Sequence, residues 1–378
     1  MEFFKPRGTI NFMKHRKPII IGSLSLALLG FLSVFYPGPN YGIDFKGGTE
    51  MQLRFKKDLE ASTLRSALAE IGHDDAEVVN VEGRKNEYMI RVGRVSSLPA
   101  EQFEQIKKKL DWDISGVKVE EMKVSPGGDK IVLKLRDELP PEVVESGLRG
   151  ADAEVQRDGV TFVGPREQHR YEARLTGVAD EITAQLEQRL GEAAPETPLR
   201  VEWVGPKAGR QLRDAAIKSL LWTILFIMAY VAMRFDLRFA PGGIIALLHD
   251  ALITVLVFVI LRGEVNLSTV AALLTILGYS INDTIVIFDR IRENMTRMRD
   301  ASLYELINVS TTQTLSRSIL TSFVTLLSVL PFLIWGTPVI RDFAFALVIG
   351  MVVGSYSTIY IAAPFTEWMD KKLFPAKA

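Results

Sequence analysis

Long apolar runs alternate with short charged loops along most of this chain, and one broad charged region interrupts them. The apolar runs lie at about residues 18–36, 219–233, 243–261, 267–288, 315–335 and 343–363. About 20 residues of apolar helix cross the hydrocarbon core of a bilayer. The pattern therefore predicts a membrane α-helical bundle of six transmembrane helices. The first precedes the charged region, at about 37–215, and the other five lie within 216–363.

Inside the charged region, apolar residues alternate as in strands or recur at helical spacing. Strands are predicted at about 51–55, 77–81, 87–92, 117–124, 130–135 and 200–204, and helices at about 59–71, 99–110, 141–148 and 179–190. Strand-helix-strand-strand-helix-strand order is typical of a ferredoxin-like α+β unit. We therefore predict such a domain between the first two spans, with a second, similar block inserted at about 111–177. Its polar residues form no recognisable catalytic set, which favours a binding or docking domain.

Composition excludes several kinds of chemistry. The chain has 45 basic and 45 acidic side chains, so no net charge favours nucleic acid as a partner. It contains no Cys, which excludes disulfides, thiol catalysis and Cys-ligated metal sites. The four His residues show no HExxH or paired spacing, so we expect no metal centre. We also expect no cofactor and no enzyme activity.

The first apolar run follows a basic cluster and precedes Pro37-Gly38-Pro39. A signal peptide is the alternative interpretation of this run. No small-x-small cleavage site precedes Pro37, so a retained membrane anchor is favoured.

Basic residues in the short loops predict the orientation of the bundle. Those after spans two, four and six are Arg234, Arg238, Arg290, Arg292, Arg297, Arg299, Lys371 and Lys372, whereas the opposite side has only Arg262 and Arg341. Cytoplasmic loops carry the excess of Lys and Arg. Both tails, at 1–17 and 364–378, are therefore predicted to be cytoplasmic. The α+β domain then lies in the periplasm of a Gram-negative cell.

A polar pair inside span four is the main candidate for chemistry. Asn282 and Asp283 precede the apolar residues that complete this span, and a carboxylate in hydrocarbon costs at least about 2.5 kcal/mol. Arg317 lies near the start of span five, and His249 and Asp250 lie about two turns into span three. The helical rise places Asp250, Asp283 and Arg317 at similar depths, so we expect them to meet. Because Arg stays charged, Asp283 is the group expected to load and release a proton.

Hydroxyl-bearing residues extend this candidate site. Thr275, Tyr279 and Asp283 share one face of span four, and one face of span five carries Thr314, Arg317, Thr321, Thr325 and Ser328. We expect the two faces to turn towards each other and form a polar seam that relays protons, with Tyr279, Asn282 and Thr321 in support. The alternatives stay open: Arg317 reaching the headgroups, hydroxyls that only pack, and His249 as a packed polar residue.

Two further segments carry weaker patterns. Span six has Ala346, Gly350 and Gly354 at four-residue intervals, a face that packs either within the bundle or against a partner subunit. Residues 291–312 have apolar positions among charges and predict an amphipathic helix on the cytoplasmic surface.

Several stretches together resemble the SecF members of the SecD/SecF family of the bacterial Sec translocon, which is related to RND transporters. The matching stretches are GIDFKGGT at 42–49, VGPKAG at 204–209, ALLHD at 246–250, GYSINDTIVIFDRIREN at 278–294 and TLSRSILTS at 314–322. Asp44, Gly47, Gly48, Gly205 and Pro206 belong to the first two. Read alone, GIDFKGGT is a glycine-rich linker whose spacing fits neither a Rossmann nor a P-loop motif.

The resemblance implies a multi-pass inner-membrane protein that works with SecD as a separate subunit, with the SecYEG channel and with YajC. It implies use of the proton motive force to move unfolded preproteins across the membrane, with sodium as an open alternative. In the family, the Asp and Arg that correspond to Asp283 and Arg317 are tied to proton movement. The inserted block at about 111–177 departs from the family pattern.

Two competing functions follow from the same features. An RND-type exporter of small molecules or lipids would need two such half-bundles and larger outer domains. An intramembrane aspartyl protease built on Asp250 and Asp283 would be opposed by Arg317 at the same depth, and the GxGD pattern is absent.

Overall fold

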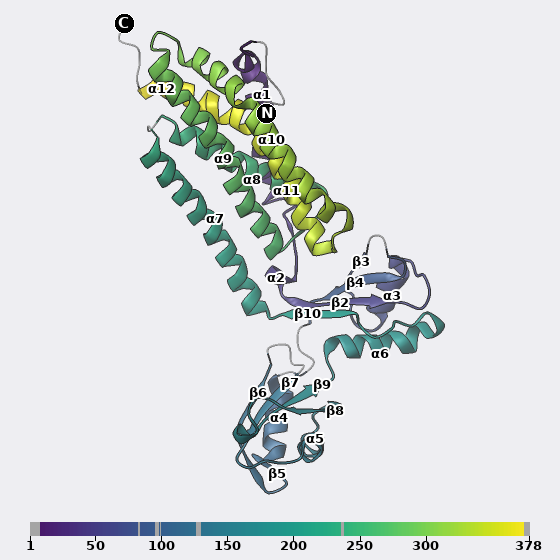
Figure 1. The fold of residues 1–378 in the computed structure, drawn as a ribbon. Coiled ribbons are helices and arrows are strands. Elements are labelled where there is room, and N and C mark those ends of the chain that lie inside the picture. The colour runs from purple at the N-terminus through teal and green to yellow at the C-terminus, as the bar shows by residue number, and fades with distance from the viewer. Residues whose placement is uncertain are drawn as a thin grey trace. The chain divides into compact units, whose positions relative to one another are not determined.

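The computed structural model describes residues 8–81, 84–94, 98, 100–125, 130–235 and 238–373 of the chain. It divides into two compact units, drawn in Figure 1. Residues Met1–Gly42 and Arg213–Ala378 form a helical bundle, and Ile43–Leu212 form an α+β domain.

Six segments of the described chain are long and apolar enough to cross a membrane, as predicted. They contain α1 (Arg16–Ser33), α7 (Pro206–Arg234), α8 (Ala240–Ile260), α9 (Leu267–Arg297), α10 (Leu303–Trp335) and α11 (Pro338–Ser357). A π-helical turn at Thr358–Ala362 continues α11 into α12 (Ala363–Leu373). Single-turn π elements inside helices are frequent at functional sites.

Local sequence explains where the central helices begin. Asn266 caps α9, because its side chain accepts a hydrogen bond from the backbone N–H of Thr269 at 3.0 Å. Ser302 and Glu305 form a capping box that starts α10. The segment 291–312, predicted as one surface helix, is instead the end of α9, a turn and the start of α10. That prediction was wrong because Ile291 and Ile307 lie in the bundle core rather than on a surface face.

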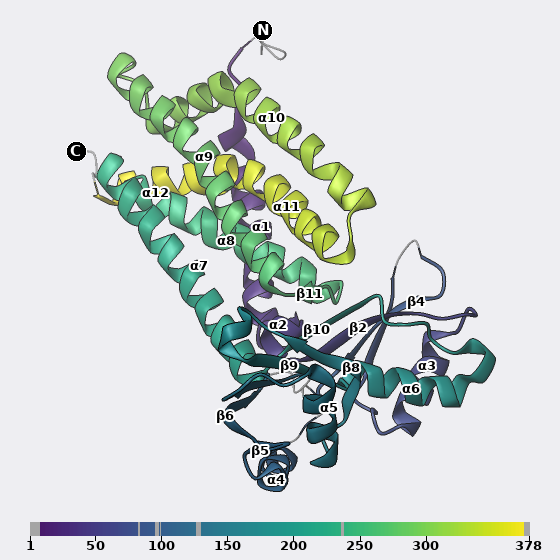
Figure 2. The same cartoon turned by 60° about the horizontal axis from the view of Figure 1, so that its bottom comes forward.

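Helix α9 lies at the centre of the bundle and packs against α8, α10 and α11 (Figure 2). Gly350 of α11 faces Ile276 of α9 so closely that an added Cβ atom would lie 2.3 Å from Cδ1 of Ile276. A Cβ atom added at Gly354 would lie 3.2 Å from Cβ of Ser280. The small-residue face of span six therefore packs within the bundle, which decides between the two alternatives.

Two short parallel strands pair at the point where the chain passes from the bundle into the α+β domain. Strand β1 (Asn40–Tyr41) follows α1 and pairs with β11 (Glu264–Val265), which lies between α8 and α9. The backbone N–H of Gly42 donates to the carbonyl of Val265 at 2.9 Å. The segment that enters the α+β domain is thus held against the α8–α9 connection.

The segments on either side of the inserted block together form a unit with the predicted ferredoxin-like topology. Its sheet has the order β10-β2-β4-β3, with antiparallel neighbours throughout. The strands are β2 (Gly48–Arg54), β3 (Glu77–Asn80), β4 (Glu87–Val92) and β10 (Arg200–Val204). Helices α3 (Ala61–Glu70) and α6 (Val178–Leu190) bury their apolar stripes against one face of this sheet. A short helix, α2 (Ile43–Lys46), precedes β2.

The inserted block forms a second sheet with its own core. Its order is β5-β6-β7-β9-β8, formed by Asp113–Ile114, Val117–Val124, Lys130–Leu135, Arg170–Leu175 and Val155–Phe162 respectively. Helices α4 (Ala100–Leu110) and α5 (Pro141–Gly150) pack with it. Leu98, Ile106 and Leu110 belong to this second core, so the block begins near residue 98 rather than 111. The boundary differs because α4 buries its apolar stripe against the second sheet.

Candidate functional site

Asp283 is buried in the bundle, as its position in span four predicts. It lies on α9, and 5% of its surface is exposed. A small pocket beside it is bounded by α9, α10, α11 and the π-helical turn. The residues that line this pocket are Asp283, Ile287, Thr311, Thr314, Leu315, Ser318, Ser355, Thr358 and Ile359. A carboxylate is therefore held where three helices meet.

Arg317 and Asp283 interact through space rather than as a contact ion pair. Arg317 lies exposed on α10, the helix that contributes Thr311, Thr314, Leu315 and Ser318 to the Asp283 pocket. Across the described residues, no salt bridge within 4.0 Å joins the two. Ser322 is buried on the same helix, and its hydroxyl lies 3.0 Å from that of Ser355 on α11. Arg317 and Asp283 are thus carried by neighbouring helices, α10 and α9, without a direct ion pair.

The other residues of the predicted seam behave differently from one another. The hydroxyls of Thr314, Thr321 and Thr325 bond to carbonyls of their own helix α10. Such bonds satisfy each hydroxyl within its helix. Thr314 lines the same pocket as Asp283, whereas the printed hydrogen bonds of Thr321 and Thr325 stay within α10.

The supporting face on α9 is also interrupted. Thr275 and Asn282 are exposed. Tyr279 is partly buried, and its hydroxyl oxygen is enclosed without a hydrogen-bond partner among the residues that the structure describes. Tyr279 is therefore the polar group on this face that has spare bonding capacity next to Asp283.

Asp250 lies in a second polar site rather than beside Asp283 and Arg317. Its carboxylate is fully buried, and Oδ1 lies 2.8 Å from Nδ1 of His249. Oδ2 accepts hydrogen bonds from the hydroxyls of Ser280 at 2.6 Å and Ser357 at 2.9 Å. The three charged residues expected to meet are thus divided between two sites, because hydroxyls of α9 and α11 surround Asp250.

His249 continues this second site to the first helix. Its Nε2 atom lies 2.5 Å from Oγ of Ser23 on α1, and that oxygen lies 2.8 Å from the hydroxyl of Tyr356 on α11. The rings of His249 and Tyr356 meet edge to face with centroids 5.7 Å apart. Four helices, α1, α8, α9 and α11, therefore contribute to one buried polar cluster.

A pair of threonines lies between the two sites. The hydroxyls of Thr284 on α9 and Thr358 in the π-helical turn are 3.1 Å apart, and Thr358 also lines the Asp283 pocket. Sequence reasoning did not find Ser23, Ser280, Tyr356 and Ser357. Each is an ordinary small or aromatic residue of an apolar span, and only the adjacent His249 and Asp250 gave a signal.

The two glycine-containing motifs pack together in the α+β domain. Gly47 and Gly48 have φ of 78° and 133°, a backbone that side chains other than that of glycine rarely allow. A Cβ atom added at Gly209 would lie 3.1 Å from the carbonyl oxygen of Phe45 and 3.2 Å from N of Gly47. Asp44 lies in α2 between these contacts, and Gly205 and Pro206 lie where β10 passes into α7. The motifs therefore form one packed junction rather than a flexible linker.

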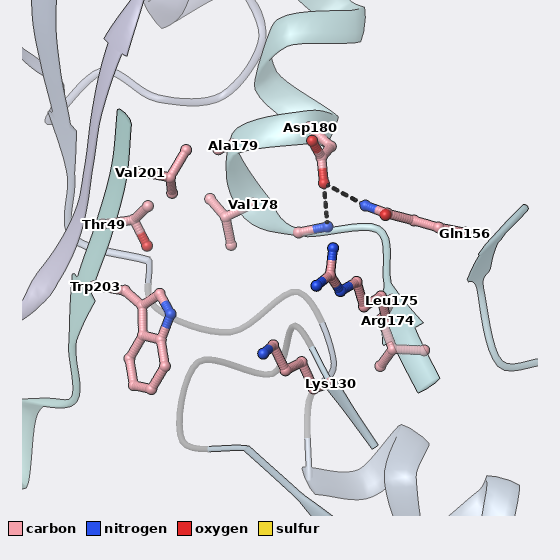
Figure 3. A pocket seen from close by; sticks show the side chains of 11 residues that line it. Thr49, Lys130, Gln156, Arg174, Leu175, Val178, Ala179, Asp180, Val201 and Trp203 are labelled. Atoms are coloured by element: carbon pink, nitrogen blue, oxygen red, sulfur yellow. Dashed lines mark hydrogen bonds between the residues drawn. The ribbon is translucent and has the colours of Figure 1, made fainter. Parts of the chain in front are cut away.

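A cavity of about 260 Å³ lies in the same domain (Figure 3). Trp203 and Val201 of β10 line one side, and Lys130 and Arg174 of the second sheet line the other. Asp180 accepts hydrogen bonds from the backbone N–H of Gly177 and from the Gln156 amide at 3.0 and 2.9 Å. Lys130 forms a 2.8 Å ion pair with Glu172. Because that acid offsets part of the positive charge, the cavity is not a strong anion site.

Metal chemistry finds no support in this geometry. Over the described ranges, no group of three or more His, Asp or Glu side chains is arranged to hold a metal ion. Asp250 and Asp283 belong to different polar sites, so these two described residues do not form the carboxylate dyad that an aspartyl protease requires.

Two family models match the chain. The model described as "Protein export membrane protein SecD/SecF, C-terminal" matches residues 185–372, and the "SecD/SecF GG Motif" matches residues 33–58. The second match contains the glycine motif of α2 and β2. The first contains α9, α10 and both polar sites except Ser23.

Individual relatives extend the likeness to almost the whole chain. The protein translocase subunit SecF of Magnetococcus marinus is 34% identical over 370 residues, covering 98% of this chain and 95% of that protein. The SecF of Pseudomonas aeruginosa is 32% identical, with 98% and 96% covered. The longer SecDF of Thermus thermophilus is 33% identical over 96% of this chain and 39% of its own length.

A solved structure agrees with these matches. The crystal structure of SecDF from Thermus thermophilus, described as a translocon-associated membrane protein, aligns with a TM-score of 0.65 at 31% identity. The alignment covers 95% of this chain and 38% of that chain. The chain therefore belongs to the SecD/SecF family of protein export membrane proteins and corresponds over nearly its full length to SecF.

Proposed function

We propose that this chain is a SecF-like accessory subunit of the Sec translocon that uses the proton motive force to promote translocation of unfolded preproteins across the inner membrane and their release. Relatives named as translocase subunits support the accessory role. The single observation that supports the coupling is a buried carboxylate, Asp283, under the electrostatic influence of one cation, Arg317.

The chemistry of the pair suits a proton-driven switch. Arg317 keeps its charge at all ordinary pH values, so Asp283 is the member whose charge changes. A movement of α10 relative to α9 changes the separation of the pair and with it the proton affinity of Asp283. One elementary charge that crosses 100 mV provides about 2.3 kcal/mol, enough to bias such a movement. The proton is the proposed coupling ion, and sodium would act through the same carboxylate.

SecD is the proposed neighbour in the membrane. A fused SecDF chain among the relatives supports this association. Helix α10 presents exposed apolar residues on the side that the bundle leaves uncovered: Ile319, Leu320, Phe323, Val324 and Leu327. A SecD helix over this face would shield Arg317 from lipid. The SecYEG channel, YajC and the preprotein complete the proposed set of partners.

The proposed orientation has both termini in the cytoplasm and the α+β domain in the periplasm. It rests on the excess of Arg and Lys after spans two, four and six. The chain has no natural Cys, so single-Cys variants can be labelled without background. We expect a membrane-impermeant maleimide to label Val163→Cys in intact spheroplasts and Thr296→Cys only after lysis. Labelling of Thr296→Cys before lysis would reverse the orientation.

The central experiment measures export driven by the proton gradient. Asp283→Asn and Arg317→Met are each expected to lower the gradient-dependent part of preprotein translocation into inverted vesicles at least tenfold. Gradient-independent, ATP-driven translocation should stay unchanged. Asp289→Asn, an exposed acid on the same helix, is the matched control. Normal gradient-dependent export by both variants, at wild-type membrane levels, would refute the proposal.

A further inference from the structure

A continuous chain of buried hydrogen bonds crosses the bundle from α9 to α1. It runs from Ser280 on α9 to Asp250 and His249 on α8 and then to Ser23 on α1, with successive separations of 2.6, 2.8 and 2.5 Å. Tyr356 on α11 bonds to Ser23 at 2.8 Å. Two helices that are far apart in sequence are thus joined through side chains alone.

Hydrogen-bond chemistry makes Asp250 the acceptor on which the bonds of this chain converge. A carboxylate accepts, so the hydroxyl of Ser280 donates to Asp250, and Nδ1 of His249 carries a hydrogen. In the tautomer with its hydrogen on Nδ1 alone, Nε2 accepts from the hydroxyl of Ser23, and Ser23 accepts from Tyr356. Every member has a partner, and the donors all point towards Asp250.

Burial makes the chain costly to break. Asp250 is 0% exposed and His249 is 1% exposed, and Ser280 and Ser23 are also buried. A buried polar group that loses its partner costs about 1–3 kcal/mol, and more if it is charged. A shift of α9 that separated the chain would therefore leave buried polar groups without partners.

Helix packing strengthens the connection at its far end. Helices α1 and α8 lie side by side, and an added Cβ atom at Gly30 would lie 2.3 Å from the carbonyl oxygen of Leu252. Ala27 is buried between Ser23 and Gly30 on the same face of α1. Beyond Ser33 the chain passes through β1 into the α+β domain.

We propose that the hydrogen-bond chain Ser280–Asp250–His249–Ser23 couples the position of α9, which carries Asp283, to α1, the helix that leads into the outer domain. Ser280 precedes Asp283 by three residues, which is about 4.5 Å along the helix axis. The inference rests on the proposed function of Asp283. It assigns His249 and Ser23 the role of positioning residues, because neither lines the Asp283 pocket.

Structural support alone predicts a different behaviour from coupling. If the hydrogen-bond chain only supports the structure, removing one of its bonds lowers stability, but α1 still responds to a change at Asp283 as before. A coupling element transmits the change at Asp283, and cutting the element removes the response. Only this second behaviour is evidence of coupling between sites.

Hydrogen–deuterium exchange of the full chain in lipid nanodiscs measures the response directly. We expect Asp283→Asn to change the exchange rates of the α1 amides about fivefold or more, a typical strength for coupled sites. In the Ser23→Ala background the same change at Asp283 should leave α1 exchange unaltered. The proposal would be overturned if Asp283→Asn changed α1 exchange equally with Ser23 and with Ser23→Ala. It would also be overturned if Asp283→Asn alone left α1 exchange unchanged.

Matched variants separate the links of the chain. Ser25→Ala is the control, because Ser25 is exposed on α1 and its hydroxyl bonds to the Ile21 carbonyl of its own helix. His249→Asn keeps a polar group near Asp250, whereas His249→Gln keeps one near Ser23. Each is expected to abolish the α1 response, since each restores one link only. A response retained by both would overturn the assignment of His249.

The result is distinguishable from failure of the proposed function. If Asp283→Asn exports normally and α1 still responds through Ser23, the proton role fails and the coupling stands. If Asp283→Asn blocks gradient-dependent export but the response of α1 exchange is the same with and without Ser23→Ala, the proton role stands and the coupling fails.

Discussion

The hydroxyl of Ser280 on α9 donates a 2.6 Å hydrogen bond to Oδ2 of Asp250 on α8. This bond places the helix of Asp283 in direct contact with a second acidic group, which is enclosed by hydroxyls and by His249. The bundle therefore holds one acid that lines a pocket beside α10, the helix of Arg317, and another that is held by hydrogen bonds from Ser280, Ser357 and His249. The first suits a change of charge, and the second suits the transmission of movement.

Replacing Asp250 with Asn is expected to destabilise the bundle by about 2–3 kcal/mol. The carboxylate offers two acceptor oxygens to His249, Ser280 and Ser357, whereas the amide of Asn offers only one. Thermal unfolding in detergent at pH 7 measures the loss. Asp289→Asn is the control, since the Asp289–Arg292 pair is on the surface and is worth less than about 1 kcal/mol. Equal losses for the two variants would contradict the importance of the buried site.

Replacing Gly350 with Ala tests the contact between α9 and α11. The new Cβ atom would lie within 2.6 Å of three side-chain atoms of Ile276, and such overpacking costs about 1–3 kcal/mol. Gly278→Ala makes the same change on α9, where nothing lies within 4 Å, and should not destabilise the bundle. Unfolding temperatures in one detergent compare the two. A stable Gly350→Ala would mean that the helices are not packed this closely.

Replacing Gly48 with Ala tests the junction of the glycine motifs. Gly48 has φ of 133°, and an added Cβ atom would lie 2.6 Å from the carbonyl oxygen of Val92. The strained backbone alone costs about 1–3 kcal/mol. We expect a corresponding loss in urea unfolding monitored by tryptophan fluorescence. Gly205→Ala, with open space around it, is the control. Similar midpoints for the two variants would refute the strain at Gly48.

The stability of the α+β domain is expected to fall in acid because of Glu87, which is 3% exposed. Burial alone would raise the pKa of Glu87, but hydrogen bonds from Arg54, Gln52 and Arg84 outweigh it and hold the pKa below its usual value. A lowered pKa in the folded state contributes stability above the unfolded value, about 4.3. That contribution is lost as the pH falls through the folded value.

The matching variant is Glu87→Gln, which removes the charge and keeps the shape. In urea unfolding, its stability deficit should be about 1–3 kcal/mol at pH 7 and should shrink below pH 4, where Glu87 itself becomes protonated. A deficit that is independent of pH would show that the ionised form of Glu87 contributes nothing.

Several features were predictable because a local pattern reports them directly. Six apolar runs of bilayer length specify six helices whatever their packing. The alternation of strands and helices specifies the ferredoxin-like order β10-β2-β4-β3. Asp283 was recognisable because a carboxylate inside an apolar span is costly wherever the helix lies.

Other features depend on distances between segments that no local pattern reports. Helix α4 belongs to the second core because its apolar stripe packs against the second sheet. Its sequence alone would fit either sheet. Helical spacing predicted one polar seam between α9 and α10. It did not reveal that the threonine hydroxyls of α10 donate hydrogen bonds to carbonyls of their own helix, or that Asp250 accepts a hydrogen bond from Ser280.

By itself, the sequence determined the spans, the order of the sheet and the acid in the membrane, since each depends on composition and periodicity within a short window. Only the tertiary structure decided that Ser23 and His249, 226 positions apart, share a hydrogen bond, and that Asp250 and Asp283 occupy separate sites. The physical reason is that a buried polar side chain must find its partners on whichever helices pack around it, and packing is a property of the whole bundle.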